Sequence, residues 1–375
     1  MTPIKVLHVL EVEKEAFYFN NLADFISRDE IEFSFVTFSK EGRFAESMRE
    51  RGFTVDVLNV QSKAGLARAA LDLRRIMNDR SPDVVHTHLF NPTLVGLLAA
   101  SSQKRKKLVT RHHSDALHLI EGSLKRRFYL ALEHLINRMA DHIVAPSRAV
   151  RDCLIEWEKV PAEKVTLIPY GQRRERFDAI NAETISRKRA ELGMNAQLSL
   201  VCVSRLFHRK GQRFLFEAVA PLIESGLQTK LYLVGEGDYR SQLEALAAEL
   251  GISDNIVFLG WRDDILEIIG AADIVVHPSL EDALSQSLIE SLMLERPIVA
   301  TDISGAADTL GDGKYGRLVP PADPVAFRDA LEETIANIDS AREQAKLGRA
   351  YLLEYMDVRR TTSEYEKLYR GLAGR

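Results

Sequence analysis

The sequence predicts an α/β protein built from two doubly wound domains in tandem. Short apolar runs alternate with longer amphipathic segments along most of the chain. The runs are apolar almost without interruption, which is typical of parallel strands that are buried on both faces and covered by helices. The alternation stops at a polar stretch, 170–190, and then starts again. A chain of 375 residues is long enough for two domains that each bury a core.

The N-terminal part of this pattern predicts one sheet with helices between its strands. Strands are expected near 5–11, 33–39, 54–60, 84–89, 107–113, 142–147 and 165–169, with helices such as 62–79 and 124–140. Residues 170–190 are charged and poor in apolar spacing, so we expect them to form a linker.

The C-terminal part predicts a second sheet of the same kind. Strands are expected near 198–205, 230–235, 256–260, 273–278, 297–301 and 316–319, and helices near 211–226, 239–251, 263–271, 285–295 and 324–350. Ligands of such sheets bind beyond the carboxyl ends of the strands. The loops that follow the strands are therefore where a site is expected.

The composition excludes several classes of protein. The net charge is only −4, which gives no strong field for nucleic acid, although residues 1–180 are more basic than the remainder. Cys153 and Cys202 lie far apart in apolar contexts and match neither a disulfide framework nor a zinc motif. No apolar run is long enough for a membrane span, and residues 1–15 lack the pattern of a signal peptide. We expect a soluble, cytoplasmic protein.

The first candidate site lies in 201-VCVSRLFHRKGQRFLFEAV-219. A strand pattern ends at Arg205, and Lys210 and Gly211 precede a helical pattern. Fixed cations beside the free N–H groups of a helix N-terminus make an anion site. A diphosphate fits, because two cations can share its charge. The alternative is a basic solvated loop without a ligand.

The second candidate site lies in 278-PSLEDALSQSLIESLMLERPIVATDISG-305. Asp282 follows a predicted strand and Glu290 lies about one turn into the next helix, so both carboxylates can face the same side. They would be good acceptors for sugar hydroxyls. A capping box between Ser287 and Glu290 would explain Glu290 without a ligand, and acidic residues also favour a first helical turn.

Taken together, the order and spacing of these features match a known family. The chain resembles the retaining glycosyltransferases of family 4, whose GT-B fold consists of two Rossmann-like domains with an interdomain cleft. The resemblance covers nearly the whole chain. Its markers are DVVHTHL (83–89), TRHH (110–113), ADHIVAPS (140–147), KVTLIPYGQRRERF (164–177), VSRLFHRKG (203–211), LVGEGD (233–238), FLGWRDD (258–264), PSLED…LIES, VATDISG (299–305) and YGRLVPPAD (315–323).

The resemblance implies transfer of a sugar from a nucleotide-sugar, a UDP- or GDP-sugar, with the anomeric configuration kept. The acceptor would be a glycan, a glycolipid or a small molecule. In the family, the residues at the positions of Arg205 and Lys210 hold the donor diphosphate and stabilise the departing charge. Members generally need no metal, and the nucleotide-sugar is a substrate rather than a cofactor. The sequence agrees in having no Asp-x-Asp pair.

The resemblance also implies a set of donor-binding residues. The position of Glu290 binds the ribose. A Glu and the small loop after it bind the donor sugar, but here that Glu is an Asp and the loop lacks the usual Gly, aromatic and Gly. The base is expected near a Trp-Arg pair after a strand end, although ordinary packing would also explain the Trp. The set is Asp282, Ala283, Leu284, Ser285, Glu290, Trp261 and Arg262.

On the N-terminal side, the family's T-x-H pattern places the active-site histidine at His112, in contact with the transferring sugar or the acceptor. His113 is the alternative, because side chains alternate along an extended segment. His86 and His88 are spaced like metal ligands, but no third ligand is evident. We interpret them as strand positions of which only one faces the cleft, and we expect no metal site.

The loop after the first strand, 11-EVEKEAFYFNN-21, has no glycine where family members usually carry a Gly-Gly pair. Cβ atoms make the approach of this backbone to a phosphate harder. Glu13 and Lys14 in this loop are candidate acceptor-side residues. The missing glycines and Asp282 favour the alternative function, a GT-B protein that binds a nucleotide-sugar or a glycan without turnover.

The resemblance implies an N-terminal acceptor domain, 1–178, and a C-terminal donor domain, 179–351, with a last helix, 352–375, that packs back on the first domain. Basic clusters at 104–107 and 125–127 would suit a lipid-linked acceptor or peripheral contact with the inner face of a membrane. An ordinary solvated surface is the alternative. The implied process is polysaccharide or glycolipid biosynthesis.

Overall fold

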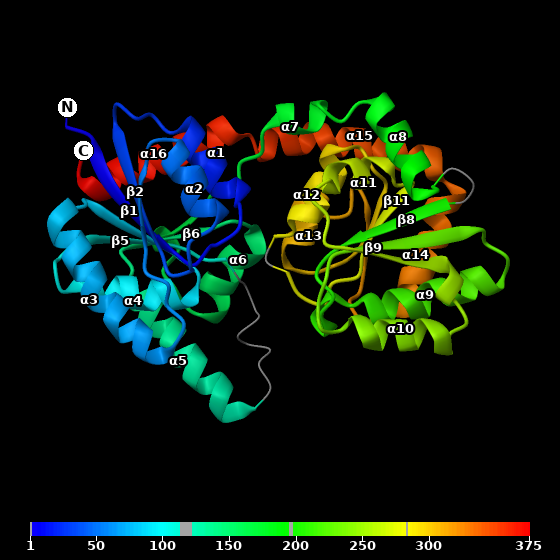
Figure 1. Cartoon of the computed structure of the whole chain (residues 1–375), viewed down its shortest axis with the longest axis horizontal. Helices are drawn as coiled ribbons and strands as arrows, with labels where there is room; N and C mark the ends of the chain where they lie inside the picture. The colour runs from blue at the N-terminus through cyan, green and yellow to red at the C-terminus, as the bar shows by residue number, and fades with distance from the viewer. Residues whose placement is uncertain (1, 113–121, 195–197, 283) are drawn as a thin grey trace. The chain divides into compact units, whose positions relative to one another are not determined.

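The structure is a computed structural model that describes residues 2–112, 122–194, 198–282 and 284–375. The chain divides into two compact units. Unit 1 comprises the residues up to Gln172 together with Met356–Arg375, and unit 2 comprises Arg173–Tyr355. Each unit is a parallel sheet with helices on its faces, which confirms the predicted α/β class (Figure 1).

Unit 1 has a parallel sheet with the strand order β3-β2-β1-β4-β5-β6-β7. The strands are β1 (Ile4–Leu10), β2 (Ile31–Thr37), β3 (Thr54–Val57), β4 (Val84–His88), β5 (Lys106–Thr110), β6 (His142–Ala145) and β7 (Val165–Leu167). The helices are α1 (Phe17–Phe25), α2 (Arg43–Glu50), α3 (Lys63–Arg80), α4 (Phe90–Ser101), α5 (Ser123–Met139), α6 (Arg148–Asp152) and α16 (Val358–Ala373).

Both faces of this sheet are buried, as the uninterrupted apolar runs predict. On one face Leu7 and Val9 of β1 pack in a cluster with Leu73 and Met77 of α3. On the other face, residues of β1 and β2 pack in a cluster with α1, α2 and Tyr365 of α16. The sheet therefore carries few side chains that can reach a ligand except at its ends.

The last helix, α16, belongs to unit 1 although it is far from β1 in the sequence. Figure 1 shows it beside α1. Its Tyr365 and Tyr369 are fully buried, and the Tyr18 hydroxyl donates to the Tyr365 hydroxyl at 2.8 Å. The backbone N–H of Gln172 donates to the carbonyl oxygen of Met356 at 2.7 Å.

Unit 2 has a parallel sheet with the strand order β10-β9-β8-β11-β12-β13. The strands are β8 (Leu198–Val203), β9 (Thr229–Val234), β10 (Ile256–Gly260), β11 (Ile274–His277), β12 (Ile298–Thr301) and β13 (Arg317–Val319). The helices are α7 (Arg174–Asp178), α8 (Ala182–Leu192), α9 (Gln212–Glu224), α10 (Arg240–Glu249), α11 (Ile265–Ala271), α12 (Gln286–Met293), α13 (Ser304–Thr309), α14 (Pro324–Ala336) and α15 (Ile338–Tyr355).

The structure corrects two predicted elements. Residues 170–190 are largely helical rather than a linker, because the Asn181 side chain caps α8 by accepting from the backbone N–H of Thr184 and Gly193 ends the helix in the left-handed region. The single helix expected over 324–350 is two helices that break at Asn337. Among the helices of the described residues, none is both long enough and apolar enough to cross a membrane.

Both sheets reverse their strand order next to their first strand. In unit 1 the reversal lies between β1 and β4, and in unit 2 it lies between β8 and β11. Connections leave on opposite faces at such a point, so the carboxyl ends of the two strands border a crevice where ligands bind. This topology singles out the loops after these four strands.

The core of unit 1 contains three histidines where apolar residues are usual. His8 of β1 lies opposite His86 of β4 in the register. His86 and His88 are two residues apart and so face the same side, with ring centres 4.2 Å apart. The expectation that only one of them faces the cleft assumed that they point to opposite sides of the sheet, and the structure shows that they do not. All three are buried, and burial lowers the pKa of His8 to about 3 and the pKa values of His86 and His88 well below their ordinary value.

Unit 1 should therefore lose stability in mild acid. The three histidines stay neutral in the folded protein, whereas in the unfolded chain each takes up a proton below about pH 6.5. The unfolded state then binds more protons, so the free energy of unfolding falls as pH falls, by about 1.4 kcal/mol per histidine and pH unit. Urea unfolding at about pH 7.5 and about pH 5.5 measures this.

The variant His8→Leu should make that pH dependence shallower, because one titrating group is gone. Replacement of the exposed His134 by Gln is the matched control and should leave the dependence unchanged. A free energy of unfolding that stays constant over this pH range would contradict the prediction.

Candidate functional site

In unit 2, two loops meet beyond the carboxyl ends of β8 and β11. The backbone N–H of Leu280 donates to the carbonyl oxygen of Arg209 at 2.9 Å and joins the loops. Gly211 has a φ of +68°, and a Cβ there would lie 1.9 Å from the carbonyl oxygen of Pro278. Only glycine permits this approach. The loop with the predicted cations and the loop with the predicted carboxylate are therefore brought together.

Two ion pairs connect these loops. The Lys210 Nζ lies 2.8 Å from the Asp282 Oδ2, and both side chains are mostly buried. The Arg209 Nη1 lies 2.9 Å from the Glu281 Oε1 at a more exposed position. A charge-assisted hydrogen bond is strong where water is partly excluded. An anion that binds Lys210 has to replace the carboxylate of Asp282 or share the cation with it.

Arg205 lies in the same loop as Lys210, and its side chain is exposed. Its guanidinium carbon lies 4.8 Å from the ring centre of Phe207. This cation–π contact orients the guanidinium plane, and the N–H donors at its edge have the geometry to bind a phosphate.

His277, the last residue of β11, adds a neutral imidazole to this region. Its Nε2 lies 4.0 Å from the Asp282 Oδ2 and has no hydrogen-bond partner among the described residues. Burial lowers the pKa of His277 to about 4, although Asp282 favours the charged form. The ring can form a hydrogen bond to Asp282 after a small movement, or to a ligand that takes the place of that carboxylate.

Glu290 is buried in α12 and paired with Arg176 of α7. The Arg176 Nη2 lies 2.8 Å from the Glu290 Oε1, and the Gln286 Nε2 donates to the same oxygen at 3.3 Å. Burial raises the pKa of Glu290, and Arg176 opposes that shift. The capping box that would explain Glu290 without a ligand is absent, because α12 begins at Gln286, has Ser285 as its N-cap without a side-chain cap bond, and so includes Ser287.

The remaining predicted donor-binding residues lie in different surroundings. Leu284 and Ser285 are buried next to α12, Ala283 lies outside the described residues, and Trp261 is 51% exposed after β10. The Arg262 Nε donates to the Asp264 Oδ1 at 2.7 Å and its Nη2 to the Glu191 Oε1 at 3.2 Å. Hydrogen bonding to Asp264 raises the pKa of Arg262, so this cation is already held by carboxylates.

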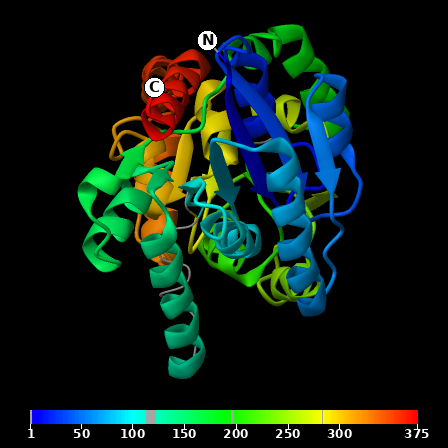
Figure 2. The same ribbon diagram turned by 90° about the vertical axis from the view of Figure 1, so that its left-hand side faces the viewer.

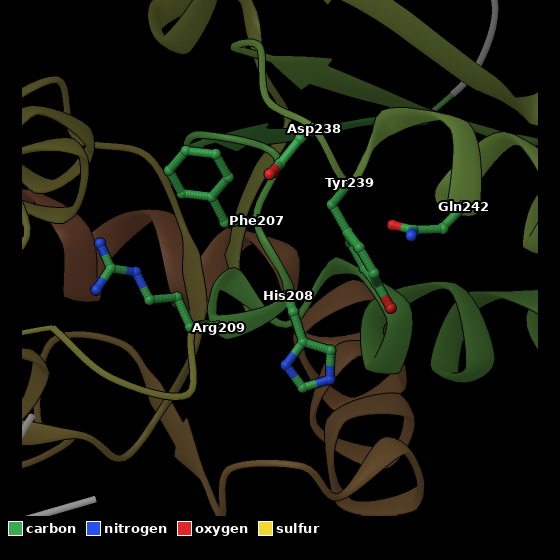
Figure 3. A pocket seen from close by; sticks show the side chains of 6 residues that line it. All are labelled: Phe207, His208, Arg209, Asp238, Tyr239 and Gln242. Atoms are coloured by element: carbon green, nitrogen blue, oxygen red, sulfur yellow. The ribbon is translucent and has the colours of Figure 1, made fainter. Parts of the chain in front are cut away.

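A surface hollow of ≈ 650 Å³ lies beside the loop that carries the cations (Figure 3). The backbone N–H of Tyr239 donates to the carbonyl oxygen of Leu206 at 3.1 Å and joins the loop after β9 to the loop after β8. The rings of His208 and Tyr239 meet edge to face at 5.6 Å. Aromatic faces next to polar groups suit ring-shaped polar ligands. The lining residues are Phe207, His208, Arg209, Asp238, Tyr239 and Gln242.

In unit 1, His112 follows β5 and both of its ring nitrogens are hydrogen-bonded. Its Nδ1 lies 2.6 Å from the Tyr170 hydroxyl and its Nε2 lies 3.2 Å from the His88 Nδ1. The neighbouring Arg111 is buried, and its Nη1 lies 3.0 Å from the Glu133 Oε2. His113, the alternative to His112, lies outside the described residues.

The glycine-free loop after β1 holds the candidate acceptor-side residues. The Glu13 carboxylate lies 3.4 Å from the Lys40 Nζ, and the Glu13 carbonyl oxygen accepts from the backbone N–H of Phe44 at 3.0 Å. Lys14 is exposed in the same loop. These contacts hold the loop against the start of α2.

The histidine cluster supplies the third imidazole that the sequence did not reveal. Ring nitrogens of His8, His86 and His88 lie within 4.8 Å of one another, close enough for a metal ion. However, the nitrogens of His86 already lie 2.9 Å from the Tyr369 hydroxyl and 2.7 Å from the Thr110 hydroxyl. The group contains no carboxylate, so a divalent ion would bring an uncompensated charge into an aromatic core.

Three residues of these sites were missed by sequence reasoning. Arg176 lies in the presumed linker and carries no local signal, because its partner Glu290 is remote in the sequence. His277 at a strand end could have been found from the run IVVHPS. Tyr170 is the first residue of the same predicted linker, and nothing in the sequence indicated its contact with His112.

Comparisons with known proteins agree with these two units. A family model described as Glycosyl transferase 4-like domain matches residues 16–171, and one described as Glycosyl transferases group 1 matches residues 197–337. The chain is 24% identical over 288 residues, 75% of this chain and 74% of the relative, to the UDP-Gal:alpha-D-GlcNAc-diphosphoundecaprenol alpha-1,3-galactosyltransferase of Escherichia coli. It is 32% identical over 181 residues, 48% of this chain and 52% of the relative, to the lipopolysaccharide core biosynthesis glycosyltransferase LpsE of Rhizobium meliloti.

The fold has a close counterpart among solved structures. The crystal structure of HepE from Anabaena in complex with UDP matches with a TM-score of 0.84 and 21% identity over 98% of this chain and 100% of that one. The two parallel sheets in tandem, together with this match to a solved structure, place the chain in the GT-B fold class. The chain belongs to the GT-B glycosyltransferases of group 1, family 4, and it is a glycosyltransferase.

The close approach at Gly211 predicts a matched pair of variants. Gly211→Ala and Gly193→Ala place a side chain at nearly the same φ, +68° and +69°, which costs about 1 kcal/mol in each. A Cβ at Gly193 meets nothing within 4 Å, whereas one at Gly211 meets the carbonyl oxygen of Pro278. Only Gly211→Ala should part the two loops.

The expected result is a lower melting temperature for Gly211→Ala than for Gly193→Ala, because only the first substitution disturbs the contact between the loops. Thermal unfolding measures it. Equal effects of the two substitutions would contradict the importance of the loop contact.

Proposed function

We propose that the protein transfers a sugar from a nucleotide-sugar to an acceptor hydroxyl with retention of the anomeric configuration and without a metal. The observation that carries the proposal is the Lys210–Asp282 pair at the switch point of unit 2. The pair places a cation, which can bind a diphosphate, beside a carboxylate, which can accept a hydrogen bond from a sugar hydroxyl. Lys210 and Arg205 would bind the diphosphate, and Asp282 would accept from a hydroxyl of the sugar.

In the proposed reaction, the bond between the anomeric carbon and the diphosphate oxygen breaks. The acceptor oxygen bonds to that carbon on the same face, and its proton leaves with the nucleoside diphosphate. Negative charge grows on the diphosphate as the bond breaks. Arg205 and Lys210 are fixed cations that stabilise this charge. In this proposal they make a metal ion unnecessary for stabilising the leaving diphosphate.

Glu290 is proposed to bind the ribose. Its carboxylate is buried, and Arg176 compensates its charge. A buried carboxylate held by hydrogen bonds on one oxygen is a directional acceptor for a sugar hydroxyl. Arg176 is thus proposed to position Glu290 rather than to touch the donor.

A UDP-sugar is the proposed donor. HepE has been solved with UDP and with UDP-glucose, and the relative from E. coli carries UDP-Gal in its name. The hollow beside Phe207 and Tyr239, or the exposed Trp261, offers aromatic surface to a base. His112 is proposed to contact the transferring sugar or the acceptor, and Glu13 and Lys14 are proposed on the acceptor side.

Binding without turnover is the second candidate function. The specific observation in its favour is the glycine-free loop after β1, in which Glu13 is engaged with Lys40. Such a protein would bind the donor but would neither transfer the sugar nor slowly hydrolyse the donor.

Removal of the cations tests the proposed mechanism. Arg205→Ala and Lys210→Ala should each lower kcat/KM for transfer by roughly 10²- to 10³-fold, because each removes charge stabilisation from the leaving group. Arg213→Ala is the matched control, since Arg213 is an exposed cation on α9 paired with Glu217. Release of UDP from UDP-glucose and UDP-galactose, with and without acceptors, is the measurement.

Full activity in both cation variants would contradict the mechanism. Binding of UDP that is lost in these variants, with no turnover of any donor, would instead favour the binding-only function.

For the acceptor, we propose a lipid-linked glycan reached at an anionic membrane surface. The first turn of α5 carries Lys125, Arg126 and Arg127 between Leu124, 82% exposed, and Phe128, 61% exposed. This end of α5 projects from the rest of unit 1 (Figures 1 and 2).

The charges at this end oppose helix stability. Cations at a helix N-terminus interact unfavourably with the helix dipole, and the turn has neither an acidic residue nor a side-chain cap. Stability alone therefore does not explain them. Basic residues that flank exposed Leu and Phe side chains suit the interface of an anionic bilayer.

Charge reversal on α5 tests this contact. The triple change Lys125→Glu, Arg126→Glu and Arg127→Glu should weaken binding to vesicles that contain anionic lipid by about 10²-fold, since each basic residue contributes about 1 kcal/mol. Co-sedimentation measures it. Arg74→Glu with Arg75→Glu, on exposed positions of α3, is the control and should have a much smaller effect. Equal weakening by both sets would contradict a specific contact through α5.

A further inference from the structure

A chain of hydrogen bonds runs from His112 into the core of unit 1. The Tyr170 hydroxyl lies 2.6 Å from the His112 Nδ1, and the His112 Nε2 lies 3.2 Å from the His88 Nδ1. The His88 Nε2 lies 3.1 Å from the His8 Nδ1. The chain ends there, because the His8 Nε2 is buried and has no hydrogen-bond partner among the described residues. The four residues come from segments around β1, β4, β5 and β7.

Elementary hydrogen-bond rules restrict the protons in this chain. A neutral imidazole has one N–H and one bare nitrogen, so it donates on one side and accepts on the other. Each of the two links between histidine rings joins a δ nitrogen to an ε nitrogen. The links must therefore all run in the same direction, and the three rings must carry their proton at the same position, either all on Nδ1 or all on Nε2.

The outer link sets the direction. A separation of 2.6 Å is short for an N–H donor, whose bonds to oxygen span about 2.7–3.2 Å, and is usual for an O–H donor. The Tyr170 hydroxyl thus donates to the His112 Nδ1. The His112 Nε2–H then donates to His88, and the His88 Nε2–H donates to His8. All three rings carry their proton on Nε2.

The inner end of the chain tolerates this arrangement. His8 is surrounded by aromatic rings, with Phe33 edge to face at 4.5 Å and Phe35 stacked at 5.1 Å. Aromatic faces can accept weak hydrogen bonds from N–H groups, so aromatic surroundings tolerate an Nε2–H on His8 better than aliphatic ones would. Burial also lowers the pKa values of His8 and His88, which keeps both rings neutral as the chain requires.

We infer that Tyr170, His88 and His8 hold His112 as its Nε2–H tautomer through this one-way chain, with His88 as a positioning residue for His112. Both ring nitrogens of His112 are then committed inside unit 1. His112 cannot act as a general acid or base on the sugar or the acceptor without breaking a link. It offers a fixed, uncharged ring instead. The consequence for transfer rests on the proposed function, whereas the tautomers do not.

Nitrogen NMR of the histidine rings tests the chain directly. Protein labelled with ¹⁵N-histidine, with neither donor nor acceptor added, gives ring correlations that distinguish Nδ1–H from Nε2–H. Single substitutions assign the signals. His8, His88 and His112 should all show the Nε2–H pattern. Different tautomers in His88 and His112 would overturn the inference.

Substitution of His88 tests its positioning role. His88→Phe keeps an aromatic ring and removes both links, so His112 should shift toward a mixture of tautomers. His88→Gln should restore the Nε2–H pattern, because its amide can accept from His112 and donate to His8. His134→Phe, an exposed histidine on α5, is the control. An unchanged His112 signal in folded His88→Phe would overturn the role of His88.

Tyr170→Phe provides a variant outside the core in case His88→Phe does not fold. It removes the hydroxyl that sets the direction and should also release the His112 tautomer. A stoichiometric metal ion retained by the wild-type protein and lost in His8→Phe would overturn the chain, because the metal would occupy the lone pairs on which the links depend.

Kinetics separate this inference from the proposed function. His88→Phe should lower kcat by roughly 10- to 100-fold, with the KM for the donor changed much less, because positioning rather than binding is lost. Gln at this position should recover most of the rate. If the NMR result holds but the wild-type protein transfers no sugar, the proposed function fails and the chain stands.

Discussion

Burial of both faces of the parallel sheets is the constraint on which the rest of this structure depends. β1 and β4 in unit 1, and β8 and β11 in unit 2, lie in the middle of their sheets and are nearly inaccessible. Side chains on such strands are enclosed by helices, so groups that meet a ligand must lie in the loops beyond the strand ends. The order of the strands then decides which loops become neighbours. The loops that carry Lys210 and Asp282 are distant in sequence but adjacent in space, because β8 pairs with β11.

This constraint also explains how much could be predicted from the sequence. Apolar runs mark strands because burial on both faces selects apolar residues. The prediction that Lys210 and Asp282 lie in loops after two of these strands is confirmed. What failed depends on distant contacts. Arg176 is recognisable only once Glu290 is known to lie beside it, and α8 depends on its caps rather than on an apolar stripe. The third histidine, His8, became visible only through the register of β1 with β4.

At the candidate site of unit 2, three charged side chains are each paired with a side chain of opposite charge. Lys210 has Asp282, Arg209 has Glu281, and Glu290 has Arg176. A buried charge without a partner is costly, so these pairs let the protein fold around groups that a charged ligand would require. For Lys210, a bound diphosphate would exchange one anionic partner for another. An anion too weak to replace Asp282 would gain little, which favours a doubly charged ligand over a single carboxylate or a sugar alone.

The histidines of unit 1 show the opposite solution, a polar core without charge. Desolvation keeps the rings neutral, and a neutral ring can pass on the direction of one hydrogen bond to the next. Polar groups of this core also contact α16. The His86 Nδ1 lies 2.9 Å from the Tyr369 hydroxyl, and the Thr110 hydroxyl lies 3.4 Å from the Tyr365 hydroxyl. The C-terminal helix therefore packs on the strands that orient His112. A change in the position of α16 would alter the hydrogen bonds of His86, whose ring centre lies 4.2 Å from that of His88.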